Sequence, residues 1–469
     1  VLVAGAICIG LCLFGIRGRM GYNPIKVSQA YYCEDPFLNQ LGVNPVFNLL
    51  TSTLDDNRKE NRTLHLMSEE DALSKVQKYL HRQGIDRLSP IARKVEREGT
   101  PNRRNVVLVF MESMSANLMG TFGSDKKLTP YLDSLYQQSL SFSHFYSSGI
   151  HTNHGIYSTL YSFPAIMKRN AMKGSVIPVY SGLPTVLQEN GYCNLFFMTH
   201  ESQYDNMNAF LRTNGFDEIY AQENYPSEKV VNSFGVQDDF MYQYALPILN
   251  ERAGTGNPFF SVLLSISNHP PYVIPPYFHP HSDVLEEQIV EYADWSIRQF
   301  MQAAEKQPWF DNTIFVFLGD HGKMVGTPEC EMPQSYNHIP LMIYGKDIKP
   351  GVYDGFGGQV DVSPTLLGLL NISYLQNNFG VNLLEEERPC MFFTADNLIG
   401  ARDSVNMFIY SPDSQQEFKY KLEEGKLHAA TGTDEEAFRN LKDYCFSMLQ
   451  STESLVKEHK TLDKVSVKK

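Results

Sequence analysis

An aspartate and a histidine, Asp320 and His321, lie just after the apolar run 314–318, and a glycine lies on each side of the pair. A continuous apolar run predicts a buried parallel strand, and in open α/β sheets binding sites form beyond the carboxyl ends of the strands. A carboxylate oxygen together with a neutral imidazole suits Zn or Mn. The pair alone is equally typical of a turn with a solvated aspartate, so a metal site requires ligands from other strands.

Two other segments offer such ligands. Glu112 follows the apolar run 105–111, so its carboxylate can point into the same crevice, although a lone glutamate at a strand end is as often solvated. Thr152 lies in a polar segment bounded by glycines, and its hydroxyl can be a nucleophile when a divalent cation lowers its pKa. Alone, it would be interpreted as a helix cap. Four residues would together place three oxygens and one nitrogen around one metal: Glu112, Thr152, Asp320 and His321.

The elements that must position these residues alternate between strand and helix. Helical patterns at 128–140 and 183–190 separate apolar runs that predict strands. This alternation predicts an α/β fold with a mainly parallel central sheet covered by helices on both faces. The predicted strands are 105–111, 195–198, 259–266, 314–318 and 340–344.

The pattern changes after residue 375. Short segments with turn residues between them predict a small antiparallel sheet, and residues 435–460 predict a long terminal helix. The expected strands of this C-terminal α+β subdomain, residues 376–469, are 391–394, 406–411, 417–422 and 426–430. Residues 101–375 then form the catalytic domain.

The N-terminal segment is apolar and uncharged up to Arg17. Residues 1–16 are slightly short of the roughly 20 needed to span a bilayer, which favours a transmembrane helix truncated at its front end over a buried core helix. Residues 17–100 are interpreted as a linker with one helix, which begins at the capping residue Ser68 and runs to Leu80.

Composition excludes some function classes. The net charge of −13 over 469 residues argues against a nucleic-acid partner, because such proteins normally carry a basic face. Hydrophobic and charged fractions of 42% and 20% are ordinary for a globular protein. The seven cysteines show no zinc-ribbon spacing and predict no disulfide framework.

Four short motifs in this order resemble the lipoteichoic acid synthase (phosphoglycerol transferase) family, in the sulfatase-like branch of the alkaline phosphatase superfamily. The linker around Arg17-Gly18-Arg19 and Asn44-Pro45 is also similar, so the resemblance covers nearly the whole chain. The motifs are Phe110-Met111-Glu112-Ser113, the segment around Thr152, Ser267-Asn268-His269-Pro270 and Gly319-Asp320-His321-Gly322.

The resemblance implies roles for individual residues. Glu112, Thr152, Asp320 and His321 would bind one divalent metal, manganese in the first place with magnesium or zinc as alternatives, and Thr152 would be the nucleophile. A second metal is left open. Three histidines would bind substrate, each with a purely structural role as its alternative. His269 corresponds to a histidine that contacts the phosphate, His200 stands where relatives have a substrate-binding histidine, and His338 resembles a residue near a second metal in phosphoethanolamine transferases.

The resemblance also implies a function. The chain would be a membrane-anchored transferase, with its catalytic domain on the extracytoplasmic side, that moves a phosphoglycerol-type headgroup from a lipid phosphodiester donor to an acceptor alcohol or glycan left open here. Earlier helices could set this orientation against the signal from the arginines after residue 16.

The sequence departs from the motifs of related families at two points, and alternative functions are therefore left open. Tyr204-Asp205-Asn206-Met207 stands where lipoteichoic acid synthases have a Trp-Asn-Arg stretch, which leaves the identity of the headgroup open. No Cys-x-Pro-x-Arg or Ser-x-Pro-x-Arg segment surrounds Thr152, which argues strongly against classical sulfate-ester hydrolysis. The alternatives are a phosphoethanolamine transferase, a phosphodiesterase or sulfatase-like hydrolase on the same site, and a catalytically silent envelope binding protein.

Overall fold

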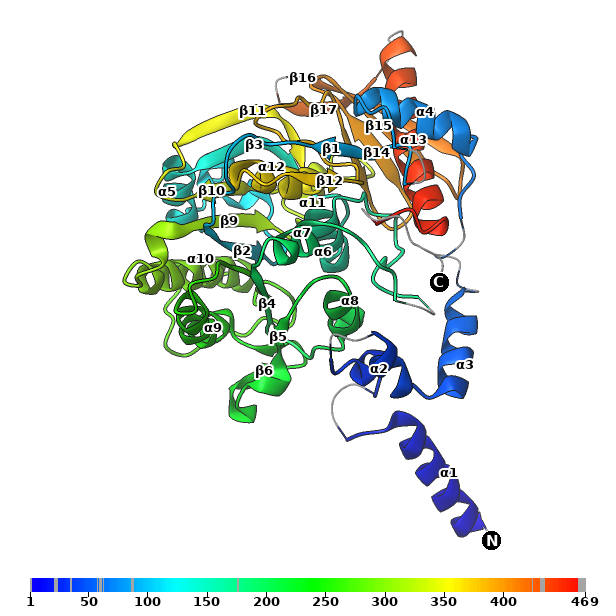
Figure 1. Ribbon diagram of the computed structural model, residues 1–469, viewed down its shortest axis with the longest axis vertical. Coiled ribbons are helices and arrows are strands. Elements are labelled where there is room, and N and C mark those ends of the chain that lie inside the picture. Colours follow the sequence, from blue (N-terminus) through cyan, green and yellow to red (C-terminus); the bar gives the residue numbers. More distant parts are fainter. Residues whose placement is uncertain are drawn as a thin grey trace.

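The computed structural model describes most of the chain (Figure 1). The described residues are 2–20, 24–33, 36–56, 58, 61, 63–85, 88–174, 177–423, 425–430 and 435–462.

An eight-stranded central sheet organises the molecule. Its strands, in chain order, are β2 (Asn105–Met111), β3 (Leu140–Tyr146), β4 (Cys193–Met198), β5 (Glu218–Tyr220), β8 (Phe259–Leu264), β9 (Thr313–Gly319), β10 (Leu341–Tyr344) and β11 (Gly351–Gly358). In space they follow the order β11-β3-β10-β9-β2-β8-β4-β5. The five strands predicted from apolar runs are all present, and β2 has the predicted bounds.

The sheet is mixed rather than uniformly parallel. Strand β10 runs antiparallel to both of its neighbours, β9 and β3, whereas every other neighbouring pair is parallel. Between β9 and β10 the chain forms only the short helix α11 (Gln334–Asn337). Without a long crossover helix the chain returns beside β9 in the opposite direction, because parallel neighbours need such a crossover. The expectation of a mainly parallel sheet holds for the other seven strands.

Helices cover both faces of the sheet (Figure 1). Alternate side chains of β2 enter two separate cores: Val106, Leu108 and Phe110 lie in one, and Val107, Val109 and Met111 lie in the other. The first core is covered by α6 (Thr152–Tyr161), α7 (Leu183–Glu189), α8 (Met207–Thr213) and α12 (Val362–Leu369). The second is covered by α5 (Pro130–Gln138), α9 (Asp238–Ala253) and α10 (Leu285–Ala304).

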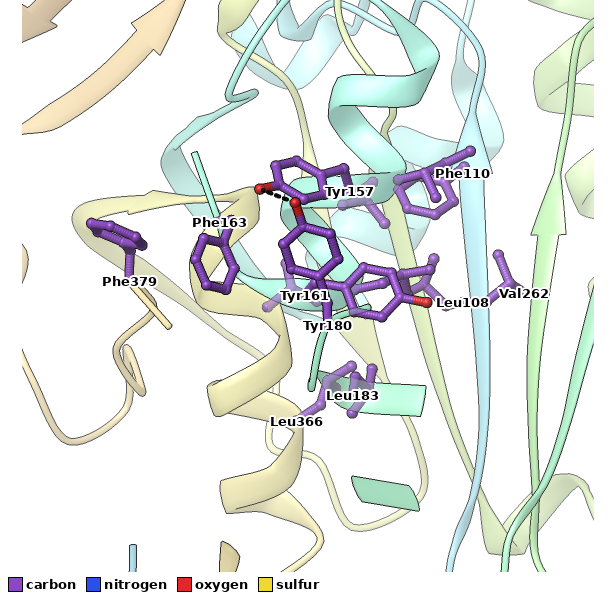
Figure 2. Close-up of a cluster of buried hydrophobic side chains, with 14 of the residues drawn as sticks. Leu108, Phe110, Tyr157, Tyr161, Phe163, Tyr180, Leu183, Val262, Leu366 and Phe379 are labelled. Atoms are coloured by element: carbon purple, nitrogen blue, oxygen red, sulfur yellow. Dashed lines mark hydrogen bonds between the residues drawn. The ribbon is translucent and has the colours of Figure 1, made fainter. Parts of the chain in front are cut away.

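A cluster of aromatic side chains fixes helix α6 (Figure 2). Tyr157 and Tyr161 on this helix pack around Tyr180, and the Tyr157 hydroxyl donates to the Tyr180 hydroxyl at 3.5 Å. Phe163, just beyond the helix, packs edge-on against Tyr180. Residues 153–161 are all buried. Since large rings in fixed contact leave a helix little freedom to rotate or slide, the position of its first residue, Thr152, is set by this core.

The C-terminal part forms the predicted small antiparallel sheet with a terminal helix. The sheet order follows the chain, from β13 to β17, and α13 (Glu435–Lys457) packs against it. Within this C-terminal sheet, only β14 has no counterpart among the predicted strands. The strands are β13 (Met391–Thr394), β14 (Ile399–Arg402), β15 (Asn406–Ser411), β16 (Gln416–Glu423) and β17 (Lys426–Ala429).

The segment before residue 101 contacts the rest of the protein at several places, among them Arg19 with Glu201 and the backbone carbonyls of Ser28 and Tyr31 with Asn208. Helix α4 (Glu69–Tyr79) begins at Ser68, whose Oγ accepts a hydrogen bond from the backbone N–H of Asp71, as predicted. Tyr79 on α4 contacts Tyr444 on α13 with ring centroids 5.0 Å apart. Strand β1 (Arg93–Val95) pairs with β12 (Tyr374–Gln376). The boundaries at residues 100 and 375 stay predictions.

Among the described residues, three α-helices precede α4: α1 (Leu2–Arg17), α2 (Pro36–Leu41) and α3 (Pro45–Asp56). Helix α1 is apolar, and none of its residues is buried. Among the described residues, no helix combines the length and the apolar character that a membrane crossing requires.

Candidate active site

Two neighbouring strands bring the predicted acidic ligands together. Met111 at the end of β2 is the register partner of Gly319 at the end of β9, so the next residues, Glu112 and Asp320, emerge side by side. His321 follows directly. One ligand atom from each of Glu112, Asp320 and His321 lies within 4.8 Å of the other two. The cluster therefore lies beyond the carboxyl ends of β2 and β9, where open α/β sheets form their binding sites.

The backbone after β2 is bent to hold the two carboxylates. Ser113 has a φ of +50°, a conformation uncommon for a residue with a side chain. In this position its N–H donates to Asp320 Oδ1 at 2.8 Å, and its hydroxyl donates to Glu112 Oε1 at 2.7 Å. One strained residue therefore orients both carboxylates, which is typical of functional sites.

The cluster has the ligand atoms of a cation site, and some of their lone pairs are free for a cation. Burial and the neighbouring Asp320 raise the pKa of Glu112 well above its ordinary value. Asp320 Oδ2 is buried and accepts no hydrogen bond from any described residue. The Nδ1–H of His321 donates to the Gly322 carbonyl at 2.7 Å, which leaves the lone pair of Nε2 for a ligand. That nitrogen lies 3.6 Å from Asp320 Oδ2 and 3.8 Å from Glu112 Oε1. The residues thus fit a divalent cation.

Thr152 stands beside this cluster as the first residue of α6. Its hydroxyl lies 3.4 Å from Glu112 Oε2. The cap position of the helix belongs to His151, not to Thr152. Helix α6 can approach this closely because Gly155 has no side chain: a Cβ there would lie 2.2 Å from the Asp320 carbonyl oxygen. The positive end of the helix dipole therefore faces the cluster, which favours bound anions.

Of the predicted substrate histidines, His269 interacts with the cluster and His200 interacts with His269. Burial lowers the pKa of His269, whose Nδ1–H donates to the Pro270 carbonyl at 2.6 Å, and the charges of His321 and Asp320 also act on it. His200 is buried, with Nδ1 3.0 Å from the Glu201 carbonyl and no partner for Nε2 in the described part of the chain. Burial lowers its pKa, and His269 adds to this effect.

His338 has a different environment. Its ring stacks on Tyr146 and packs edge-on against Phe122, with centroids 5.2 Å apart in both pairs. Nε2 lies 2.9 Å from the Ser143 carbonyl and donates to it. Burial lowers its pKa to about 4. These contacts are those of a packed structural histidine between β3 and β10, and the cluster shares none of them.

Lys323 is a charged residue at the site that the motifs did not single out. Its Nζ donates to Asn268 Oδ1 at 2.6 Å, and Asn268 Nδ2 in turn donates to the Glu112 carbonyl at 3.0 Å. Burial lowers the pKa of Lys323 to about 8, while Glu112 favours its charged form. The ammonium also lies over the Tyr272 ring, 5.6 Å from its centroid. Only its place two residues after His321 could have suggested this role.

The C-terminal sheet also contributes a charged residue that contacts the start of α6. Asp396, in the turn between β13 and β14, lies with Oδ1 2.6 Å from Nε2 of His151, the residue before Thr152. Sequence reasoning missed this pair, because nothing local relates residues so far apart in the chain.

The segment that departs from the lipoteichoic acid synthase pattern lies beside α6. Asp205, with a φ of +49°, accepts a hydrogen bond from Asn153 Nδ2 at 3.0 Å and forms an ion pair with Lys173 at 3.2 Å. Tyr204 packs against His200 with centroids 4.7 Å apart. Burial raises the pKa of Tyr204 to about 12, and the charges of Glu112 and Asp320 add to this effect. This segment carries an acidic residue and no arginine.

Comparisons with known proteins agree with this geometry. The family model described as Sulfatase matches residues 104–372. The lipoteichoic acid synthase-like protein YvgJ of Bacillus subtilis is 25% identical over 362 residues, which cover 70% of this chain and 56% of that protein. The lipoteichoic acid synthase of Staphylococcus aureus is 24% identical over 400 residues, covering 75% and 58%. The chain thus spans little more than half the length of these relatives.

Solved structures share the fold. A protein of the alkaline phosphatase superfamily from Vibrio parahaemolyticus has a TM-score of 0.76 and 26% identity, covering 84% of this chain and 97% of that one. The lipoteichoic acid synthase LtaP from Listeria monocytogenes has a TM-score of 0.66 and 21% identity, covering 82% and 98%. The comparisons confirm the family resemblance that the motifs indicated.

Proposed function

Because the chain belongs to the sulfatase family, we propose that it is a membrane-anchored, metal-dependent transferase that moves a phosphoglycerol-type headgroup from a lipid donor through a phospho-threonine intermediate. One observation carries this proposal. The Thr152 hydroxyl, at the start of α6, lies 3.4 Å from Glu112, which forms a cation-binding cluster with Asp320 and His321. The relatives named lipoteichoic acid synthase support the phosphoglycerol headgroup.

Glu112, Asp320, His321 and Thr152 would hold one divalent cation. Manganese is the first choice, with magnesium or zinc as alternatives, because two carboxylates and a hydroxyl suit a hard ion and the imidazole suits a softer one. When bound, such a cation supplies Lewis-acid chemistry: it lowers the pKa of the threonine hydroxyl and offsets negative charge on the phosphate.

The protein side chains would then carry out two displacements. Deprotonated Thr152 Oγ1 forms a bond to phosphorus while the bond from phosphorus to the lipid alcohol oxygen breaks, and that oxygen takes a proton from His269. In the second displacement the acceptor alcohol returns a proton to His269 and attacks phosphorus, and the bond to Thr152 breaks. Burial lowers the pKa of His269, but a phosphate anion beside the ring raises it again, since an opposite charge favours the protonated form.

Lys323 and His200 would hold the phosphate. Lys323 keeps a positive charge at neutral pH, because its pKa is about 8. It can offset charge on a non-bridging oxygen, the task that an arginine would otherwise perform. The second contact is Nε2 of buried His200, which has no hydrogen-bond partner among the described residues. Both groups are held by the fold before substrate arrives, so little reorganisation is needed on binding.

A phosphoethanolamine transferase is the second candidate. The observation that favours it is Asp205, in a segment where a glycerol-phosphate enzyme would offer an arginine. His338 gives this candidate less support, because its ring is engaged with Tyr146 and its Nε2 with Ser143.

Anchoring at the outer side of the cell membrane is part of the proposal. The exposed, apolar helix α1 supports it. A donor that is itself a lipid would be reached at the same surface, so anchoring would raise its effective concentration.

Intact-mass measurement after incubation with manganese and phosphatidylglycerol tests the proposal. We expect a glycerol-phosphate adduct on native protein and on Thr159→Ala, a change in a buried residue of the same helix, but none on Thr152→Ala. Full turnover by Thr152→Ala would refute the mechanism. An adduct formed only with phosphatidylethanolamine would establish the second candidate. Protein that retains no stoichiometric metal and forms neither adduct would be a silent binding protein.

A further inference from the structure

A pocket of about 600 Å³ opens beside α10, and we refer to it as the α10 pocket. Its walls are residues within 126–130, residues within 278–282, and one face of α10 from Glu287 to Arg298. Its volume is that of a site for a small molecule or a sugar. Nothing in the proposed chemistry at Thr152 uses it.

The α10 pocket lies on the same edge of the sheet as the catalytic cluster. The loop that leads to residues 126–130 begins at Glu112, and the loop that leads to residues 278–282 begins at Asn268 and His269. At the start of α10, the charge of Glu286 acts on Lys323 at the cluster. Two walls of the pocket are therefore continuations of segments that form the catalytic site.

The walls are held in place before any ligand binds. Glu291 accepts hydrogen bonds from the backbone N–H groups of His281 at 2.6 Å and Ser282 at 3.0 Å. Glu287 joins the two loops, because it accepts from Lys126 Nζ and from the Ser282 hydroxyl, both at 2.6 Å. Both carboxylates are thus engaged in holding the loops.

An aromatic surface and two cations remain for a ligand. Trp295 is half-buried, and its ring packs against Phe278 with centroids 5.5 Å apart. Within the described part of the chain, neither Lys127 nor Arg298 forms a hydrogen bond or an ion pair. Asp294, the remaining acid of the pocket, is buried and accepts from the backbone N–H groups of Tyr131 and Leu132. The charge of Arg298 also acts on Asp294, and the cations Lys127 and Arg298 keep hydrogen-bond donors for a ligand.

We propose that the α10 pocket binds an anionic saccharide, with the apolar face of the sugar on Trp295 and the acidic group facing Lys127 and Arg298. Indole rings suit ligands that are apolar on one face and polar at the edge, and lysine and arginine bind phosphate or carboxylate. Within the proposed transferase this ligand is the acceptor. That assignment rests on the proposed function, whereas the binding site does not.

Tryptophan fluorescence offers a direct test, because the chain has only two tryptophans. Trp295 lies in the pocket, whereas Trp309 is buried against Phe259 and donates to Asn250. Metal-free protein in EDTA, which suppresses binding at the catalytic cluster, is titrated with glucose 6-phosphate, with glucose and with inorganic phosphate. We expect a saturable change with glucose 6-phosphate at concentrations where the other two give little. The change should persist in Trp309→Phe and vanish in Trp295→Phe.

Charge variants complete the test. Lys127→Glu and Arg298→Glu should each weaken glucose 6-phosphate binding by about tenfold or more, the usual effect of losing a charge-assisted hydrogen bond. Lys349→Glu, an exposed change in the turn between β10 and β11, should leave binding unchanged. Lys127→Ala and Arg298→Ala serve where a charge reversal disturbs folding.

Equal binding of phosphate and glucose 6-phosphate, unchanged binding by the charge variants, or no saturable signal would each overturn the proposal. The two proposals fail separately. Protein that forms the Thr152 adduct but binds no sugar phosphate refutes only the pocket. Protein that binds sugar phosphate but forms no adduct refutes only the transferase.

Discussion

Manganese should stabilise the metal-free protein against heat, and the stabilisation should increase with pH. Burial and Asp320 raise the pKa of Glu112. Because this pKa is above that of the unfolded chain, the stability contributed by protonated Glu112 is present at low pH and is lost as pH rises through the folded-state value. A cation needs the ionised carboxylate, so at low pH it must displace a proton. Binding therefore becomes stronger as pH rises.

The size of the effect follows from linkage. A ligand that binds only the folded state stabilises it by about 2.7 kcal/mol at a concentration 100 times its Kd. One kcal/mol shifts Tm by about 2–4 °C in a domain of 150–250 residues and by less in a larger one. We therefore expect a shift of a few degrees. Each pH unit below the pKa of Glu112 should weaken manganese binding by about tenfold, because one proton is displaced.

Calorimetric or fluorescence melting with and without manganese at several pH values measures this shift. Asp320→Asn should abolish most of it, since that change removes a charged ligand. The Glu112→Gln variant should bind manganese weakly and with less pH dependence. The Glu98→Gln variant, changed at an exposed residue, should show the same shift as the native protein. An equal shift in Asp320→Asn, or a native shift that shrinks with rising pH, would show that manganese does not bind at this cluster.

Three further substitutions test particular contacts. Lys323→Met should lower kcat/KM for the phospholipid donor by about 10²-fold, the usual loss for one preorganised donor of a developing charge; unchanged kinetics would contradict its phosphate role. His338→Leu should lower the free energy of unfolding by about 1–3 kcal/mol, because the Ser143 carbonyl loses its hydrogen-bond donor. Denaturant unfolding measures this, and lost turnover at unchanged stability would instead indicate substrate contact. Arg388 and Asp361 form a buried ion pair. Arg388→Met should lower the free energy of unfolding in urea by about 3–5 kcal/mol, because Asp361 is left as an unpaired buried charge. The double variant Arg388→Met/Asp361→Leu should recover part of that loss.

Much of the fold could be predicted from local sequence. Strands β2 and β9 are continuous apolar runs with polar residues at both ends, so their positions follow from residue type alone. Such runs carry no information about strand direction, and the reversal of β10 depends on what connects it to β9. Strand β3 was not predicted. One reason is that Leu140, where β3 begins, also fits the helical pattern before it.

The acidic and histidine ligands could be predicted because strand ends meet at one edge of a parallel sheet. Their spacing depends on the register of β2 against β9, which no local pattern sets. The position of Thr152 depends on how the aromatic core packs around α6, and no local sequence pattern shows that packing. Lys323 and Asp396 were missed because their contacts with Asn268 and His151 join segments far apart in the chain.

The contact between α4 and α13 also bears on the order in which the chain can fold. Val76 and Leu80 share a buried core with Phe438 and Leu441 near the other end of the chain. Contacts between such distant segments form late, because a long loop must close first. As the chain emerges from the ribosome, the apolar side of α4 stays exposed until α13 has been synthesised. We therefore expect a protein truncated before α13 to be a substrate for chaperones and proteases even if its central sheet has formed.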